Sequence, residues 1–405
     1  MTIEFSTILK WRIYVRPVIR SAARRSRGIC SALILIFTLI LPIPAGSQSK
    51  SSALPQPELR WSEQRANEWY ASQPWLVGSN YIPATAINQL EMWQADTFDL
   101  KRIDLELGWA ESIGMSVMRV FLHDLLWQQD PQGFKKRIDT FLTTADKHHI
   151  KILFVLFDSC WDPNPQLGKQ REPRPGVHNS GWVQSPGAKA LQDPSQYPRL
   201  EAYAKGVVGA FAQDKRIVGW DVWNEPNNTN SGSYEKEDPK NKVDLVLDLL
   251  PKVFEWVREA KPTQPLTSSL WRGDWSSPEK LGRMERIQVE LSDVISFHNY
   301  AKPSSFEKRI VWLQQYHRPI LCTEYMARGA GSTVQGSLPI AKRYRVAAIN
   351  WGLVAGKTQT YYPWDSWKHP YIDRQPDVWH HDIFRADGHP YSQKEVDFIR
   401  DITRK

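Results

Sequence analysis

The sequence predicts a (β/α)8 barrel, the TIM-barrel fold of the α/β class, and three observations indicate it. From about residue 75 onward, short apolar runs typical of strands alternate with longer segments of helical periodicity, as in a parallel sheet covered by helices. Two of these runs, 216–227 and 318–326, carry a glutamate near their end, and barrel enzymes place their chemistry at the C-terminal ends of strands. The 405 residues suffice for one large barrel with an N-terminal extension.

The alternative among α/β proteins is an open, doubly wound sheet. That fold predicts a glycine-rich phosphate loop after an early strand. The end of the first expected strand reads Gly78-Ser79-Asn80-Tyr81, which is not such a loop. The barrel is therefore the favoured fold.

The N-terminal segment has the pattern of an export signal. Residues 1–50 hold eight Lys or Arg and one acidic residue, a net charge of +7. An uncharged, mostly apolar run follows at 31–41, and small residues stand at Ala45 to Ser47. This order is typical of a secretory signal, which we expect to span residues 1–47 and to be cut after Ser47. The apolar run is short for a bilayer span, so an uncleaved membrane anchor is the alternative to a secreted or periplasmic protein.

The charge of the rest of the chain argues against a polyanionic partner. The whole chain has a net charge of +8, so residues 51–405 carry only +1. Neither nucleic acid nor a membrane surface is expected to bind so neutral a body. Cys160 and Cys322 fall on strands expected on opposite sides of the barrel, beyond the reach of a disulfide, and neither has the spacing of a zinc site. Two free thiols and no metal or cofactor are expected.

The expected elements follow in order after a linker and N-terminal extension at 48–74, and residues 75–405 form the barrel domain. The strands are 75–81, 116–122, 151–157, 216–223, 265–270, 294–298, 318–324 and 346–353. The helices are 98–113, 134–148, 198–213, 241–260, 304–316 and 392–402. Two long connections, 158–197 and 354–385, carry several tryptophans, and we expect them to form ordered walls rather than disordered segments.

The stretch from Arg216 to Asn227 organises the chain. Its apolar run is typical of a strand buried on both faces, and Pro226 ends the ladder because proline has no backbone donor. Glu225 is thus left at the mouth of an apolar strand, where desolvation should raise its pKa. A carboxyl group tuned in this way can donate a proton near neutral pH.

A second carboxylate, Glu324, ends the strand at 318–326. Glu324 lies three β/α units further along the chain than Glu225, so strands 4 and 7 of the barrel would carry the pair at one face. Glycoside hydrolysis requires at least two carboxylates that flank one cavity. The alternative for either residue is an ion pair at the barrel rim.

The Asn224-Glu225-Pro226 and Thr323-Glu324-Tyr325 strand ends, together with the strand order, resemble clan A of the glycoside hydrolases. Within the clan the chain is most similar to family 5, the cellulase and mannanase family, over about residues 75–402. The resemblance implies a retaining β-glycosidase that hydrolyses O-glycosidic bonds of a mannan-, glucan- or xylan-type polysaccharide or oligosaccharide, without a cofactor.

The resemblance also implies roles for single residues. Glu225 is similar to the general acid/base and Glu324 to the nucleophile. Asn224 would contact the sugar 2-hydroxyl, and Arg119 would keep the nucleophile ionised, since a nearby positive charge lowers the pKa of a carboxylate. The remaining implied contacts are from Tyr300 to Glu324, from His298 to the sugar or the acid, and from Trp351 to the sugar ring.

The chain departs from the family at the end of the third strand. Many members have a histidine there, whereas this chain offers Asp158. We expect Asp158 to bind substrate in its place, with Trp161 and Trp364 as further aromatic platforms. The motif Asn227-Asn228-Thr229 matches a glycosylation acceptor but would lie beside the cleft, so we interpret it as a chance match.

Three other functions stay open at this level. The same site could run transglycosylation, with a sugar hydroxyl in place of water. A carbohydrate-binding barrel without catalysis is a second alternative, and the presence of both glutamates argues against it. A membrane-anchored scaffold is supported only by the N-terminal segment. The sequence leaves the sugar, its linkage, internal versus terminal cleavage and the oligomeric state undecided.

Overall fold

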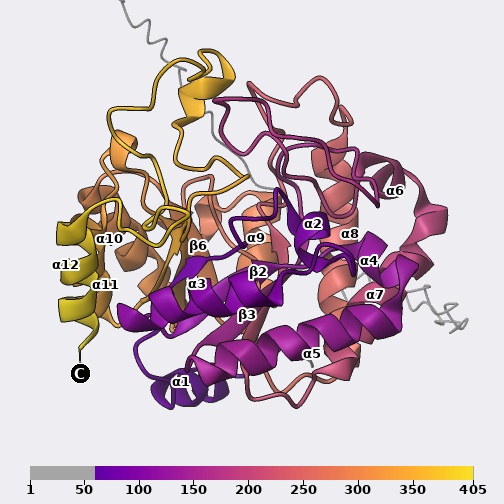
Figure 1. The fold of residues 1–405 in the computed structure, drawn as a ribbon. Helices are drawn as coiled ribbons and strands as arrows, with labels where there is room; N and C mark the ends of the chain where they lie inside the picture. The colour runs from indigo at the N-terminus through magenta and orange to yellow at the C-terminus, as the bar shows by residue number, and fades with distance from the viewer. Residues whose placement is uncertain (1–59, 405) are drawn as a thin grey trace, which may run out of the picture. The chain divides into compact units, whose positions relative to one another are not determined.

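Eight parallel strands close into a barrel in the computed structural model, which describes residues 60–404 (Figure 1). The sheet order is β5-β4-β3-β2-β1-β8-β7-β6. Just beyond β5, Leu270 donates its backbone N–H to Ser296 O at 2.9 Å and accepts from His298 N at 2.8 Å. These bonds join the two edge strands, so the predicted (β/α)8 barrel is confirmed.

The bounds of the elements agree with the expected ones to within a few residues for most of the chain. The strands are β1 (Val77–Asn80), β2 (Val117–Phe121), β3 (Lys151–Asp158), β4 (Ile217–Asn224), β5 (Leu266–Thr267), β6 (Ile295–Asn299), β7 (Ile320–Tyr325) and β8 (Ala347–Trp351). The expected helices are α3 (Leu100–Ser112), α5 (Pro131–Lys147), α7 (Tyr197–Ala210), α8 (Lys242–Glu259), α10 (Pro303–Leu313) and α12 (Gln393–Thr403). Strand β5 is shorter than its expected range.

Several helices have no counterpart in the sequence-based assignment. They are α1 (Glu63–Ala71), α2 (Gln89–Trp93), α4 (Asp124–Gln129), α6 (Ala188–Gln192), α9 (Arg283–Leu291) and α11 (Val334–Tyr344). In α11, Gly336 and Pro339 interrupt the helical pattern, because both residues disfavour a helix interior. In α9 only three residues are buried, so its apolar stripe is too narrow to indicate a helix from the sequence.

Helix α1 covers the N-terminal end of the barrel. Its Ala66 and Tyr70 are buried in one cluster with residues that point into the barrel, among them Val117, Leu153 and Val218. The apolar residues between the sheet and the surrounding helices form a separate and larger core. The described part of the predicted extension at 48–74 is therefore a helix that closes the barrel, and the predicted signal at 1–47 lies outside the described residues.

The long connections after β3 and β8 stand at the C-terminal end of the barrel, magenta and orange-yellow in Figure 1. We call residues 159–187 the β3 loop and residues 352–391 the β8 loop. The two loops are bonded to each other: Asn179 N donates to Thr358 O at 2.9 Å, and His178 N donates to Ser366 Oγ at 2.9 Å. The predicted ordered walls are present.

Within residues 60–404, no helix has both the length and the apolar character needed to cross a membrane. Cys160 and Cys322 are free thiols, and both are buried.

Candidate active site

The parallel register brings polar side chains of different strands to one level at the C-terminal end of the barrel. Asp158 of β3 is paired with Asn224 of β4, and His298 of β6 is paired with Glu324 of β7. Glu225 follows Asn224 directly, with a left-handed φ of 42°. Such a conformation costs about 1–3 kcal/mol for a residue other than glycine. This conformation takes Glu225 out of the strand, at the point where Pro226 stops the ladder.

Glu225 and Glu324 lie side by side, as their strand positions predict. His298 Nδ1 lies 2.9 Å from Glu225 Oε1 and 3.5 Å from Glu324 Oε2. One oxygen of each carboxylate lies within 4.8 Å of the other. Retaining glycosidases hold their carboxyl groups about 5–5.5 Å apart and inverting enzymes about 6.5–9.5 Å apart. A separation of at most 4.8 Å between these two oxygens agrees with the shorter class.

Glu324 is held by two donors in a buried setting. Arg119 Nη1 donates to Glu324 Oε1 at 2.7 Å, and the Tyr300 hydroxyl donates to Glu324 Oε2 at 2.7 Å. Burial raises the pKa of Glu324 above its ordinary value, while the Arg119 charge and the Tyr300 hydrogen bond act in the opposite direction. Arg119 therefore lies where the sequence predicts, but it offsets desolvation rather than producing a low pKa.

Arg119 is itself fixed by residues that the sequence reading did not single out. Its Nε and Nη2 both donate to Asp221 Oδ2, at 3.1 and 2.8 Å, and its Nη1 also donates to Asn80 Oδ1 at 2.8 Å. Arg119 and Asp221 are both fully buried. A charged residue in the middle of the apolar run of β4 was the available signal for Asp221, since buried charges are almost always paired.

Glu225 has a different set of partners. Asn228 Nδ2 donates to Glu225 Oε2 at 2.7 Å, and the Cys160 thiol lies 3.4 Å from the same oxygen. Burial raises the pKa of Glu225, as the sequence predicts, and the bonds from Asn228 and Cys160 oppose that rise. Burial also lowers the pKa of His298 to about 4, so its ring is neutral at pH 7. No cation contacts Glu225 directly within the described residues, whereas Glu324 is paired with Arg119.

Asn224 is oriented by the layer of residues beneath it. Its Oδ1 accepts from Arg119 Nη2 at 2.7 Å, and its Nδ2 donates to Asp158 Oδ1 at 2.9 Å. Asp158 is also held by Trp182 Nε1 at 2.7 Å and is 1% exposed. The expectation that Asp158 binds substrate is not supported by this placement, because Asp158 lies behind Asn224 and does not line the cavity. It orients the Asn224 amide instead.

A cavity of about 300 Å³ lies over the two carboxylates. Four tryptophans line it together with both glutamates, and they are Trp161, Trp271, Trp351 and Trp364. The sequence predicts three of these four; Trp271, just beyond β5, is the fourth. Trp161 is stacked on Trp367 with ring centroids 5.4 Å apart, which fixes its ring at the wall. Large aromatic faces around a small polar centre are typical of a carbohydrate site.

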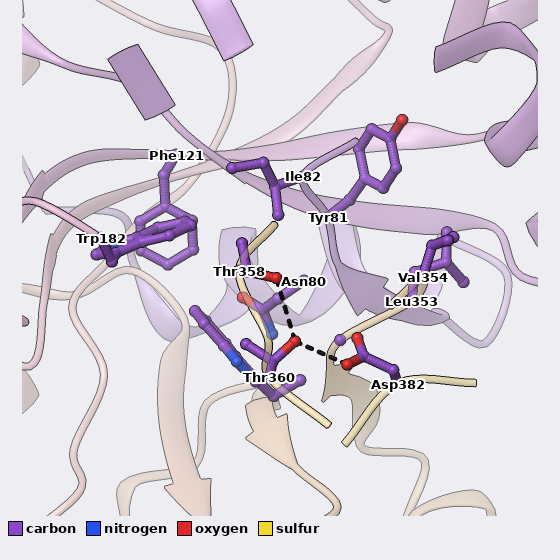
Figure 2. Close-up of a pocket in the computed structure, with 12 residues that line it drawn as sticks. Asn80, Tyr81, Ile82, Phe121, Trp182, Leu353, Val354, Thr358, Thr360 and Asp382 are labelled. Atoms are coloured by element: carbon purple, nitrogen blue, oxygen red, sulfur yellow. Dashed lines mark hydrogen bonds between the residues drawn. The ribbon is translucent and has the colours of Figure 1, made fainter. Parts of the chain in front are cut away.

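A second, much smaller cavity of about 20 Å³ is shown in Figure 2, and Trp351 lines both cavities. It has room for about one water molecule. Figure 2 shows Thr358, Thr360 and Asp382 linked by hydrogen bonds at this cavity, and Thr360 Oγ1 donates to Asp382 Oδ2 at 2.8 Å. Asp382 Oδ1 has no partner within the described residues. This cavity therefore holds an unpaired buried carboxylate oxygen, apart from the catalytic pair.

Glu225, His298 and Glu324 are also close enough together to hold a cation. Both oxygens of Glu324 already accept hydrogen bonds, from Arg119 and from Tyr300. The positive charge of Arg119 would repel a metal ion at that position. The arrangement thus fits acid/base chemistry better than metal binding.

No family model matches the chain, and no curated protein matches it. Among solved structures, the chain is similar to GH5_18 from Streptomyces cattleya in complex with GlcNAc, at 12% identity and a TM-score of 0.54 over 82% of this chain and 80% of that one. It is similar to exo-beta-1,4-mannosidase Op5Man5 from Opitutaceae bacterium strain TAV5, at 17% identity and a TM-score of 0.54 over 81% and 59% of the two chains. It is also similar to the endo-beta-1,4-mannanase from Thermotoga petrophila, at 14% identity and a TM-score of 0.51 over 83% and 77%. The expected likeness to family 5 of clan A is confirmed for the barrel fold.

Proposed function

We propose that the protein is a retaining β-glycosidase in which Glu225 is the general acid/base and Glu324 is the nucleophile. The observation that carries this proposal is the short distance between two carboxylates with unlike partners, within 4.8 Å of each other. Arg119 and Tyr300 stabilise the charge of Glu324, whereas the partners of Glu225 are a neutral amide, a thiol and a neutral histidine. Because the two carboxylates differ in their surroundings, the one with neutral partners, Glu225, is assigned as the acid, and the one beside a cation, Glu324, as the nucleophile.

The geometry supports double displacement. Glu324 attacks the anomeric carbon while Glu225 gives its proton to the glycosidic oxygen, and the alcohol leaves. Glu225, now ionised, takes a proton from a water molecule whose oxygen attacks the same carbon and releases Glu324. Asn224 would donate to the sugar 2-hydroxyl, and Trp351 would face the ring. Arg119 acts through Glu324 and is a positioning residue.

The substrate class is a β-linked polysaccharide or oligosaccharide of mannan, glucan or xylan type. β-Mannosides are the first to test, because solved proteins with the same fold include a mannosidase and a mannanase. We also propose that the protein is exported through residues 1–47, on the strength of their net charge and apolar run. Mass spectrometry of the native protein tests this: an intact N-terminus on a protein found in the cytoplasm contradicts export, and one in the membrane fraction favours the anchor.

The test of the catalytic assignment is azide rescue. We expect Glu324→Ala to abolish turnover of aryl β-glycosides and added azide to restore it with a product of inverted configuration, because azide fills the space of the lost nucleophile. Glu279→Ala, at an exposed glutamate, is the matched control and should keep full activity. Unchanged activity of Glu324→Ala would refute the assignment. Product analysis with a sugar acceptor separates hydrolysis from transglycosylation.

A further inference from the structure

Asn179 of the β3 loop borders the active-site cavity with an amide that has no partner. Neither its Oδ1 nor its Nδ2 forms a hydrogen bond within the described residues, and the side chain is 0% exposed. Each buried polar group left unpaired in this way costs stability. Its backbone is fixed, because Asn179 N donates to Thr358 O at 2.9 Å and Asn179 O accepts from Trp182 N at 3.3 Å. A rigidly held, unsatisfied amide beside a cavity can be completed by a water molecule or by a bound ligand.

The wall that carries Asn179 is continuous across the two long loops. The loops are joined through bonds from Gly176 N to Gln359 Oε1 at 2.9 Å and from Tyr371 N to Gly176 O at 2.9 Å, besides those of His178 and Asn179. The stacked pair of Trp161 and Trp367 connects them again. A polysaccharide that runs through a cleft needs both ends open, whereas the two joined loops form one continuous wall of this cavity.

The part of this wall that the β8 loop forms lies beside Glu324. His381 and Trp364 of the β8 loop lie 5.5 and 5.2 Å, between ring centroids, from Tyr300, which donates to Glu324. The cavity is also lined by Ser231 and Arg272, which follow β4 and β5 and are exposed to solvent. The charge of Arg272 acts on Glu225, so this solvent-exposed lining lies toward the proposed proton donor to the leaving group.

We infer that the cavity binds the single terminal sugar of a chain, at its non-reducing end, and that Asn179 recognises the hydroxyl groups of that sugar. The inference rests on the proposed function. The sugar that Glu324 attacks lies against the wall of the two joined loops, and the leaving group extends past Glu225 into solvent. A volume of about 300 Å³ lies at the lower end of the range for ligand pockets. The enzyme thus removes sugars one at a time from the chain end.

The first experiment follows the products. The wild type is given a tetrasaccharide labelled at its reducing end, made of the sugar that it cleaves best as an aryl β-glycoside. The inference predicts labelled trisaccharide first, then labelled disaccharide, with free monosaccharide throughout. Labelled disaccharide as the first product would overturn chain-end cleavage and leave the proposed function standing. No cleavage of any glycoside would instead overturn the proposed function.

The second experiment tests Asn179 through Asn179→Gly. Glycine suits the left-handed φ of 48° at this position, so the variant should fold. We expect kcat/KM for the aryl glycoside to fall about tenfold, as for the loss of one or two neutral hydrogen bonds, with no drop in Tm. Asn164→Ala, on the same loop with an exposed side chain, is the matched control and should match the wild type. Unchanged kcat/KM in Asn179→Gly would overturn the role of Asn179.

Discussion

Arg119 joins Glu324 to Asp221 in the barrel: its guanidinium lies 2.7 Å from Glu324 Oε1 and 2.8 Å from Asp221 Oδ2. The position of Glu324 thus depends on a carboxylate of a different strand that does not line the active-site cavity. Removing one partner of a buried pair leaves the other charge uncompensated. The position of Glu324 is accordingly fixed from inside the barrel, by Arg119 of β2 and Asp221 of β4.

Replacement of Asp221 should therefore cost both stability and activity. We predict that Asp221→Ala lowers the free energy of unfolding by about 3–5 kcal/mol, the range for a broken buried pair. Activity should fall as well, because Arg119 is no longer fixed beside Glu324. Chemical denaturation and aryl-glycoside kinetics measure the two effects. Asp373→Ala, at an exposed aspartate, is the control, and an equal effect in both variants would contradict the account.

The amide of Asn228 should tune the proton donor. Its hydrogen bond to Glu225 Oε2 stabilises the ionised carboxylate and so lowers the pKa of Glu225 against the rise from burial. In Asn228→Ala that pKa should increase, and the alkaline limb of the pH profile of kcat/KM should move to higher pH. Thr229→Ala, one residue further along the loop, should leave the profile in place. A shift to lower pH in Asn228→Ala would contradict the proposed role of Glu225.

Asp382 should make the protein less stable as the pH rises. Burial raises the pKa of Asp382 to about 7, so the folded state holds a proton that the unfolded chain releases near pH 4. The contribution of Asp382 to the free energy of unfolding is therefore greatest below about pH 4. It declines between pH 4 and about pH 7 and stays constant at higher pH. Over roughly three pH units the loss approaches about 4 kcal/mol.

Asp382→Asn removes this titration and keeps the shape, and asparagine tolerates the left-handed φ of 62°. We predict a higher Tm than the wild type at pH 8 and a smaller difference at pH 5. Thermal unfolding at both pH values measures it, with Asp373→Asn as the exposed control in the same loop. A Tm difference that grows toward acid pH would contradict the predicted loss of stability with rising pH.

The strand ends could be predicted because the apolar runs of the parallel strands stop at recognisable polar residues. Glu225, Glu324, Arg119, His298 and Tyr300 all follow from their positions in or just after such runs, and the structure brings all five together. Periodicity cannot show which loop residues meet across the barrel. Asn179, Asn228 and Trp271 belong to loops whose paths depend on long-range contacts, so only the structure assigns them to the site.

Asp158 shows that a residue predicted at a strand end can lie outside the cavity. Its place at the end of β3 is as expected, but strand position alone does not tell whether a side chain reaches the cavity or lies beneath another residue. Asp158 is covered by Asn224, whose amide it orients. A polar residue at a strand end is thus a candidate for the site, and its depth decides whether it can touch a ligand.

The most direct test of the central assignment is to trap the covalent intermediate. A 2-deoxy-2-fluoro β-glycoside with a good leaving group, made from the sugar that the wild type cleaves best, slows the release of the glycosyl group from the enzyme. Mass spectrometry of the digested protein then locates the label. The account predicts one glycosyl group per chain, attached to Glu324, and none in Glu324→Gln. A label on another residue, or rapid hydrolysis of the parent glycoside without any trapped adduct, would contradict the assignment of Glu324 as the nucleophile.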